Sequence, residues 1–151
     1  MQINKKIPLI FGVPDASFYN SLNEKKVFVA ELRPGLEGMK IVASRLLEKH
    51  IQPVIICDNM MAFCMQRGFV KKVFIFSQTG AQKKNICRTG SLIAALAAKK
   101  HKIPVYLFKT KAVLLKASSL LKINGQKVTS AHIKTYVPLL EEVPGALVKG
   151  S

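Results

Sequence analysis

The chain has 151 residues, of which 49% are hydrophobic, and this composition excludes an intrinsically disordered protein. The length corresponds to one domain, or to a piece of a larger protein, with enough apolar side chains for a packed core. The formal net charge is +16, from 24 Lys and Arg against 8 Asp and Glu. Such an excess of cations is typical of proteins with an anionic partner, such as RNA, phosphate esters or a membrane surface.

The cysteines and histidines indicate neither a disulfide framework nor a metal site. Cys57, Cys64 and Cys87 form no CxxC pair, and the 3 histidines are scattered along the chain. The sequence shows neither a secretory signal nor an apolar run of about 18 residues. We therefore expect a soluble cytoplasmic protein with no membrane segment, no metal and no cofactor.

The first predicted elements lie in an N-terminal segment. Residues 6–11 are an apolar stretch of uncertain role, which Gly12 and Pro14 close. Asp15 is a candidate cap for a short helix over residues 16–23.

Residues 27–50 predict a strand, a tight turn and a helix. Val27–Ala30 are all apolar, as expected for a strand at 27–31 that is covered on both faces. Pro34 has no N–H to donate to a neighbouring strand and ends the run, and Gly35 permits a turn. Apolar residues then recur at helical spacing over 36–49.

The same alternation continues along the chain. Asp58 is a candidate cap for a short helix that Gly68 closes, and a polar loop after residue 76 leads into a helix that starts at Ile86. Further buried strands are predicted at 53–57, 72–76 and 103–109. Asn124-Gly125 predicts a hairpin.

These elements predict the α/β class, with a Rossmann-like parallel sheet sandwiched between helices. Strands are expected near 27–31, 53–57, 73–76 and 104–108. Residues 1–24 are expected to form a lead-in segment and residues 25–151 the Rossmann-like domain. Residues 136–151, rich in proline and glycine, are expected to lie over this domain as irregular structure.

Three motifs in a fixed order carry a family resemblance. They are Glu31-Leu32-Arg33-Pro34 with Gly38, then Cys57-Asp58-Asn59-Met60-Met61-Ala62, then Arg67-Gly68-Phe69-Val70-Lys71-Lys72-Val73. Over residues 25–145 the chain resembles the C-terminal domain of the initiation-factor-2B/aldose-1-phosphate isomerase family. That family includes regulatory subunits of translation initiation factor 2B and methylthioribose-1-phosphate isomerase.

The resemblance implies an isomerase site, from which this chain departs at two places. The family's catalytic aspartate follows the third strand, where this sequence has Gln78, and an amide does not exchange protons at neutral pH. General acid–base catalysis typically contributes about 10²–10⁴-fold to a rate. The family's catalytic cysteine belongs to an N-terminal helical domain that we expect this chain to lack. We therefore assign no catalytic residue.

The resemblance also implies a phosphate site. The family's Asn-Lys-x-Gly motif is matched by Cys87-Arg88-Thr89-Gly90, which keeps a cation and a glycine at a predicted helix start. We expect a crevice at the carboxyl ends of the strands that binds a sugar phosphate or nucleotide, with Arg88 as a main phosphate contact. Its predicted lining residues are Glu31, Arg33, Asp58, Asn59, Gln78 and Arg88.

Simpler interpretations stand beside these assignments. Glu31 and Arg33 are also consistent with a solvated turn pair, and Asp58 with a helix cap. Cys57 and Cys64 are flanked by apolar residues and are expected to be buried. Cys87 lies in a polar loop beside a cation and is the stronger candidate for thiol reactivity.

Three functions remain open from the sequence. The favoured one is a domain that binds a sugar phosphate or nucleotide, without the family's isomerase activity, in a binding or regulatory role. The second is an active aldose-1-phosphate isomerase, of the methylthioribose-1-phosphate or ribose-1,5-bisphosphate type. The third is a basic domain associated with RNA or the ribosome in translation.

Two expectations concern partners. By analogy with the family, the chain is expected to form a homodimer through residues 59–66 and 136–148. RNA binding is expected to be weak and independent of sequence, because the lysines are expected on several sides of the domain. Aromatic residues make up 7% of the chain and tryptophan is absent, which leaves few platforms for base stacking.

Overall fold

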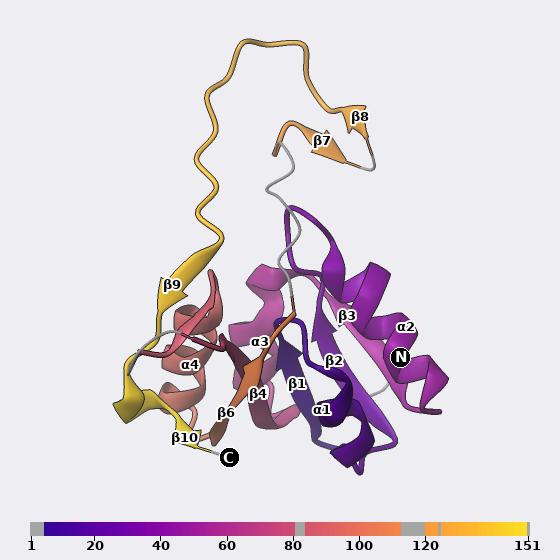
Figure 1. Ribbon diagram of the computed structural model, residues 1–151, viewed down its shortest axis with the longest axis vertical. Helices are drawn as coiled ribbons and strands as arrows, with labels where there is room; N and C mark the ends of the chain where they lie inside the picture. Colours follow the sequence, from indigo (N-terminus) through magenta and orange to yellow (C-terminus); the bar gives the residue numbers. More distant parts are fainter. Residues whose placement is uncertain (1–4, 81–83, 113–119, 124, 151) are drawn as a thin grey trace.

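The computed structural model describes residues 5–80, 84–112, 120–123 and 125–150. Its core is an 8-stranded sheet whose main path runs in the order β10-β6-β4-β1-β2-β3, with each neighbouring pair parallel (Figure 1). The strands on this path are β1 (Ile7–Phe11), β2 (Lys26–Ala30), β3 (Gln52–Ile56), β4 (Val70–Gln78), β6 (Val105–Thr110) and β10 (Lys149–Gly150). The predicted α/β fold with a parallel sheet is confirmed.

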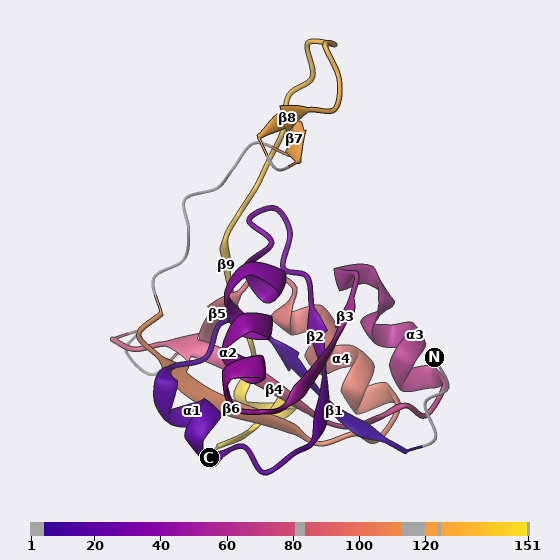
Figure 2. The same cartoon turned by 90° about the vertical axis from the view of Figure 1, so that its right-hand side faces the viewer.

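Helices cover both faces of the sheet (Figures 1 and 2). Two helices lie on each face. This follows because right-handed crossovers that run in opposite directions across the sheet place their helices on opposite faces. The first face carries α1 (Ala16–Ser21) and α2 (Ala43–Glu48), and the second carries α3 (Met61–Gln66) and α4 (Ser91–Lys100). The direction of winding therefore changes between β1 and β4, where doubly wound folds place their ligands.

The N-terminal segment contributes directly to this core. Residues 6–11, whose role the sequence left uncertain, contain β1, which pairs with both β2 and β4 near the centre of the sheet. All of its side chains are buried, as expected for an apolar run between two neighbouring strands. In α1, Phe18 packs edge-to-face against three phenylalanine rings, those of Phe74, Phe76 and Phe108.

Asp15 precedes α1 as predicted, but its side chain does not cap this helix. Its carboxylate instead accepts hydrogen bonds from the Thr110 hydroxyl at 3.0 Å and from the backbone N–H of Lys111 at 2.9 Å. Asp15 therefore joins the loop after β1 to the end of β6.

The helix predicted over 36–49 begins with a short π-helical segment, Gly38–Val42, and continues as α2. Gly38 lies against the end of β2, where a β-carbon would collide with the carbonyl oxygen of Ala30. Glycine is required here because the two backbones approach more closely than any side chain permits.

Two predictions for the later part of the chain are wrong. Ile86–Arg88 was assigned to a helix start but forms strand β5, which pairs antiparallel with β4 through Ser77 and Cys87. The closing segment was expected to be irregular, but β9 (Leu140–Glu142) pairs with β5 and β10 pairs with β6. Local apolarity did not distinguish a short strand from a helical turn at β5. The pairings of β9 with β5 and of β10 with β6 join segments that are far apart in the sequence.

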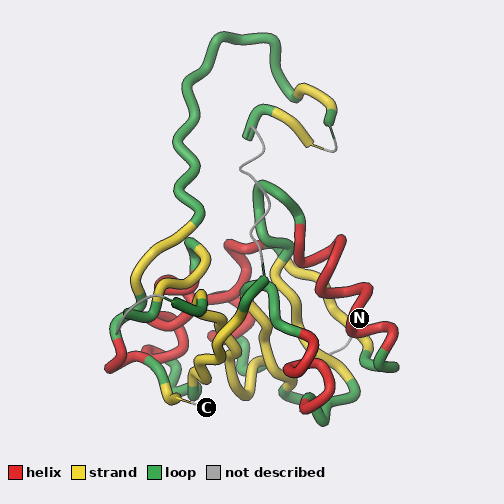
Figure 3. The backbone as a smooth tube through the Cα atoms, in the orientation of Figure 1, coloured by secondary structure: helices red, strands yellow, loops and turns green. Residues whose placement is uncertain are grey.

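The hairpin predicted at Asn124-Gly125 is present as β7 (Lys122–Ile123) and β8 (Gln126–Lys127), with residue 124 outside the described residues. Figure 3 shows that this hairpin stands away from the sheet and that an extended segment leads back from it to β9. We call residues 120–123 and 125–139, which include this hairpin and the extended segment, the arm. Large apolar side chains on the arm are exposed, including those of Ile133 and Tyr136.

Candidate functional site

The carboxyl ends of β1, β2, β3 and β4 lie side by side at one end of the strands. We call this row of strand ends the ligand edge, as distinct from the edge strands of the sheet. The sequence-predicted site residues all lie there, because each follows or ends one of these strands or belongs to β5. Glu31, Arg33, Asp58 and Gln78 are partly buried, Asn59 is exposed, and Arg88 is buried. The topology places these residues at a common edge, and their contacts differ from those predicted.

The loop after β2 has an unusual backbone. Leu32 and Leu36 both have a φ of 60°, a left-handed conformation that is costly for a branched side chain. The bond between Arg33 and Pro34 is a cis peptide. A loop of this shape persists only when its surroundings hold it in place.

Asp58 is one of the residues that hold this loop. Its carboxylate accepts hydrogen bonds from the N–H groups of Leu32, at 2.9 Å, and Arg33, at 2.7 Å. It makes no cap bond to its own helix. The loop contact was not among the roles predicted for Asp58.

Arg88 holds the same loop from the other side. Its guanidinium donates to both carboxylate oxygens of Glu37, at 2.8 and 3.0 Å, and to the carbonyl oxygens of Leu32 and Arg33, each at 3.1 Å. Only 4% of Arg88 and 2% of Glu37 are exposed. This bidentate geometry is the strongest arrangement for an arginine and a carboxylate.

The helix start beside Arg88 is also occupied by a side chain of the protein itself. The Glu141 carboxylate on β9 accepts hydrogen bonds from the N–H groups of Gly90, at 2.7 Å, and Leu92, at 2.8 Å. The cation and the helix N-terminus that resemble the family's phosphate site are therefore both compensated by internal carboxylates. No local pattern identifies Glu37 or Glu141 as partners, since each lies about 50 residues from the group that it binds.

We call the arrangement of Asp58, Arg88 and Glu37 around the loop after β2 the clamp. A cleft of about 200 Å³ opens beside it. It brings together Arg33 and Arg88 from the predicted set, with Thr89 next to them and Tyr136 from the arm. The remaining lining residues are Pro34, Leu120, Val137, Pro138 and Leu139. Glu31, Asp58, Asn59 and Gln78 do not line it.

Two residues that line this cleft have polar side-chain groups without a partner in the described part of the chain. The Arg33 guanidinium forms no ion pair within the described part of the chain, and the buried Thr89 hydroxyl has no hydrogen-bond partner there. Buried hydroxyls are normally bonded, so an unpartnered one is unusual. The Tyr136 side chain is 87% exposed. Thr89 and Tyr136 were missed by the sequence analysis.

The cysteines are arranged differently from expectation. Cys57, predicted to be buried, is exposed because β3 is the edge strand of the sheet. Cys87, the candidate reactive thiol, is fully buried, and burial together with the charge of Glu141 raises its pKa to about 12. Cys64 is buried as predicted, and burial raises the pKa of its thiol. A thiol with such a raised pKa is a poor nucleophile at neutral pH.

Metal and membrane features were also searched for within the described residues. They contain no group of three or more His, Cys, Asp or Glu side chains placed to hold a metal ion. No helix among them is long and apolar enough to cross a bilayer.

The fold is a doubly wound α/β domain, a class in which ligands bind at the carboxyl ends of the strands. The model of the initiation factor 2 subunit family matches residues 14–148, and the chain belongs to this family.

Curated relatives show the same relationship. The chain is 27% identical over 141 residues to methylthioribose-1-phosphate isomerase of Carboxydothermus hydrogenoformans, covering 83% of this chain and 41% of that protein. It is 38% identical over 82 residues to the protein of the same name from Chloroflexus aurantiacus, covering 54% of this chain and 24% of the relative. The chain thus spans less than half the length of these relatives.

Solved structures share the fold. The delta subunit of translation initiation factor eIF-2B from A. fulgidus superposes with a TM-score of 0.73 at 20% identity, covering 95% of this chain and 51% of that one. The 5-methylthioribose 1-phosphate isomerase of Pyrococcus horikoshii OT3 gives a TM-score of 0.72 at 19% identity, covering 96% and 49%.

The buried ion pair generates a stability prediction. Replacing Arg88 by Met leaves the Glu37 carboxylate buried without its partner and should lower the free energy of unfolding by about 3–5 kcal/mol. Urea denaturation followed by circular dichroism measures this change. The control is Arg45→Met, which removes an exposed arginine from its pair with Glu48 and should cost about 0–1 kcal/mol. Equal losses in the two variants would contradict the role assigned to Arg88.

The burial of the thiols generates a reactivity prediction. In the native protein at pH 8, Ellman's reagent should label Cys57 rapidly, whereas Cys64 and Cys87 should react only after denaturation. The absorbance of the released thiolate measures both stages. The Cys57→Ser variant should lose the rapid phase, and a rapid phase that persists in this variant would show that a second thiol is accessible.

Proposed function

We propose that this chain binds a sugar phosphate or nucleotide at the ligand edge, in a binding or regulatory role, and does not isomerise it. The observation that carries the proposal is the cleft in which the unpaired guanidinium of Arg33 lies with the unpartnered hydroxyl of Thr89. A cation and a hydroxyl donor are the groups that a phosphate ester requires. The volume is below the roughly 300–1,000 Å³ of drug-sized pockets, which favours a small phosphate ester.

Each residue of the predicted set has a place in this proposal. Arg33 is the phosphate contact, in the role that the sequence suggested for Arg88. Arg88 is a positioning residue, because it donates to the carbonyl of Arg33 and thereby fixes the loop that carries this side chain. Asp58 positions the same loop through the N–H of Arg33. Glu31, Asn59 and Gln78 lie at the same edge and are proposed to contact the rest of the ligand.

The absence of isomerase activity is proposed on chemical grounds. Gln78 stands where the resemblance implies a catalytic aspartate, and an amide side chain neither accepts nor supplies a proton at neutral pH. Cys87 is the cysteine nearest to the clamp in sequence, and its raised pKa keeps it protonated.

The ligand prediction uses ribose 1-phosphate, ribose 1,5-bisphosphate and nucleoside monophosphates as probes. Arg33→Gln should weaken binding of the best probe by about tenfold or more, because a hydrogen bond to a charged group contributes about 1.5–3 kcal/mol. Isothermal titration calorimetry measures the Kd. The control, Arg67→Gln, removes an exposed arginine at the opposite edge and should leave the Kd within about twofold.

Two results would overturn the proposal. Unchanged affinity in Arg33→Gln would remove the cleft as the binding site. Turnover of methylthioribose 1-phosphate or ribose 1,5-bisphosphate at ordinary enzyme rates, roughly 1–10³ per second, would establish the active isomerase instead.

We also propose a homodimer in which α3 takes part. Phe63 on α3 is 52% exposed, and Leu96 on the neighbouring α4 is 49% exposed, so apolar surface extends across both helices. Tyr136 and Leu140 add exposed apolar side chains in the second predicted segment. Contiguous exposed apolar surface is typical of an interaction site.

The dimer prediction is tested by analytical ultracentrifugation at tens of micromolar protein. The wild-type chain should sediment as a dimer, and Phe63→Glu should shift it toward monomer because a charge would be buried at the interface. The matched control is Leu47→Glu, at a 55% exposed position on the opposite face of the sheet, which should remain dimeric. A monomeric wild-type protein would refute the proposal.

A further inference from the structure

The edge of the sheet opposite the ligand edge carries 11 of the 24 Lys and Arg residues of the chain, and we call it the basic edge. The parallel strands of the main path all begin there, and the connections that precede them carry lysines. The charged residues at or beside these strand starts are Lys5, Lys6, Lys25, Lys26, Lys49, Arg67, Lys71, Lys72, Lys99, Lys100 and Lys102. All of these side chains except that of Lys72 are exposed.

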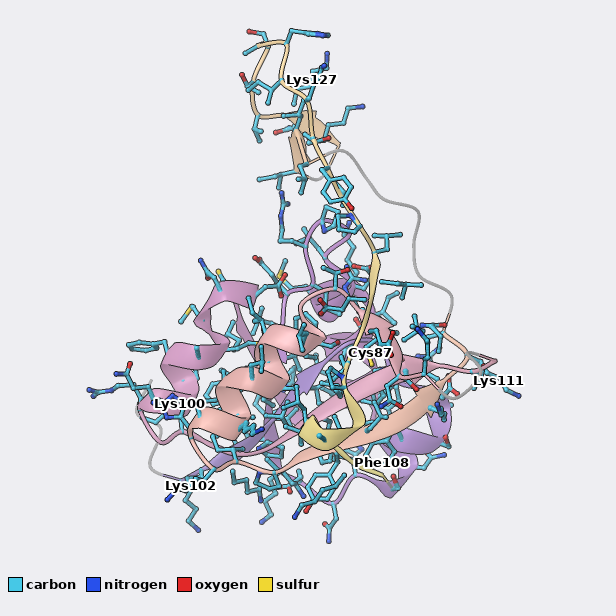
Figure 4. The ribbon with its side chains drawn as sticks, turned by 90° about the vertical axis from the view of Figure 1, so that its left-hand side faces the viewer. Cys87, Lys100, Lys102, Phe108, Lys111 and Lys127 are labelled. Carbon is cyan, nitrogen blue, oxygen red and sulfur yellow. The ribbon has the colours of Figure 1, made fainter. Side chains whose placement is uncertain are left out.

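The sheet register shows that these positions lie at one level. Lys26 on β2 pairs with Gln52 on β3, and Ile7 on β1 pairs with Val70 on β4. The backbone N–H of Val73 donates to the carbonyl oxygen of Pro104, the residue before β6. Figure 4 shows Lys100 and Lys102 at one end of β6 and Lys111 at the other. Other lysines lie on the arm and after β6, while the parallel topology gathers the strand starts, with their lysines, at one edge.

The acidic residues are distributed in the opposite way. All eight belong to the described part of the chain, and of these only Glu24 and Glu48 lie toward the basic edge. Glu24 binds Lys71 and Lys72, and Glu48 binds Arg45. The other acids lie in loops after the strands or on β9. Of these, Glu37 and Asp58 belong to the clamp and Glu141 binds the start of α4. The basic edge thus keeps a large uncompensated charge.

Two clefts hollow this edge and both are lined by cations. One, of about 410 Å³, is lined by Lys99, Lys102 and Lys149 together with backbone around Pro104 and Val148. The other, of about 340 Å³, is lined by Lys25, Lys49 and His50 together with Glu24 and uncharged residues of the loop after α1. They flank the sheet at the starts of β6 and β3, at opposite ends of the row.

The dimensions fit a nucleic-acid backbone. Five steps of about 4.8 Å separate β3 from β10, so the row is about 24 Å long. That length matches about seven base pairs at roughly 3.4 Å each. No Phe or Tyr among the described residues of the edge is exposed for base stacking. The large exposed apolar side chains that would enter a bilayer lie on helices, on the arm, on β3 (Ile55) and on β9 (Leu140). Phosphate contacts along a duplex suit this surface better than bases or lipid.

We propose that the basic edge binds the phosphate backbone of double-stranded nucleic acid independently of sequence. This site is separate from the proposed ligand cleft, which lies at the other edge. Affinity should fall as salt releases counterions, with a log–log slope of about −0.9 for each phosphate contacted.

The test compares two triple variants that lose the same charge. Lys25→Gln/Lys49→Gln/Lys99→Gln removes cations from both clefts, and Lys122→Gln/Lys127→Gln/Lys134→Gln removes them from the arm. The probe is a 20-base-pair RNA duplex, with a DNA duplex of the same sequence beside it, and the measurement is fluorescence anisotropy from 50 to 200 mM salt. Equal melting temperatures confirm that each variant folds.

The basic-edge variant should bind about tenfold more weakly at 50 mM salt, with a salt slope shallower by about two to three. The arm variant should stay within about twofold of wild type. Equal losses in both variants would show that net charge alone drives binding and would overturn the proposal. Tighter binding to phosphatidylserine vesicles than to the duplex would overturn it in favour of a membrane surface. Arg33→Gln should leave duplex binding unchanged, which separates this result from the fate of the ligand cleft.

Discussion

The ligand edge depends on one buried interaction, the paired hydrogen bonds between the Arg88 guanidinium and the Glu37 carboxylate. Glu37 belongs to the loop after β2 and Arg88 to β5, so the pair joins segments that are far apart in the sequence. Asp58 completes the arrangement from a third segment by accepting the loop's N–H groups. Polar backbone groups of a strained loop are thereby satisfied, as buried polar groups must be. The loop therefore keeps the shape that places Arg33 at the cleft.

This clamp also determines which cation is available for chemistry. A guanidinium that is bonded to a carboxylate and two carbonyls would have to exchange partners to meet an anion, and the remaining carboxylate would then be buried alone. Arg33 bears no such cost, because its side chain is partly exposed and unpaired within the described residues. Of the two arginines in the predicted phosphate site, Arg88 is therefore structural and Arg33 is accessible. Charge in a motif does not by itself identify the binding group.

The sequence predicted the parts of the fold that depend on local pattern. Continuous apolar runs located β2, β3, β4 and β6, because strands of a parallel sheet between two helical layers are mostly apolar. It did not predict what depends on strand order. Cys57 is exposed because β3 is the edge strand, and Ile86–Arg88 is extended because β4 and β9 bond to it on either side. The clamp was missed for the same reason, since Glu37 and Arg88 meet only after the sheet has formed.

The parallel sheet gives the molecule two edges of different character, and helix electrostatics explain only part of the difference. Lys99 and Lys100 lie in the last turn of α4, where a cation is stabilised by about 0.3–1 kcal/mol. Lys25 and Lys26 have no such reason to be there, because they follow a loop and not a helix end, and neither forms an ion pair within the described residues. Gathering like charges at one edge costs repulsion, which a folded chain tolerates at modest stability loss. Folding alone therefore does not account for the basic edge, whereas an anionic partner that neutralises the row does.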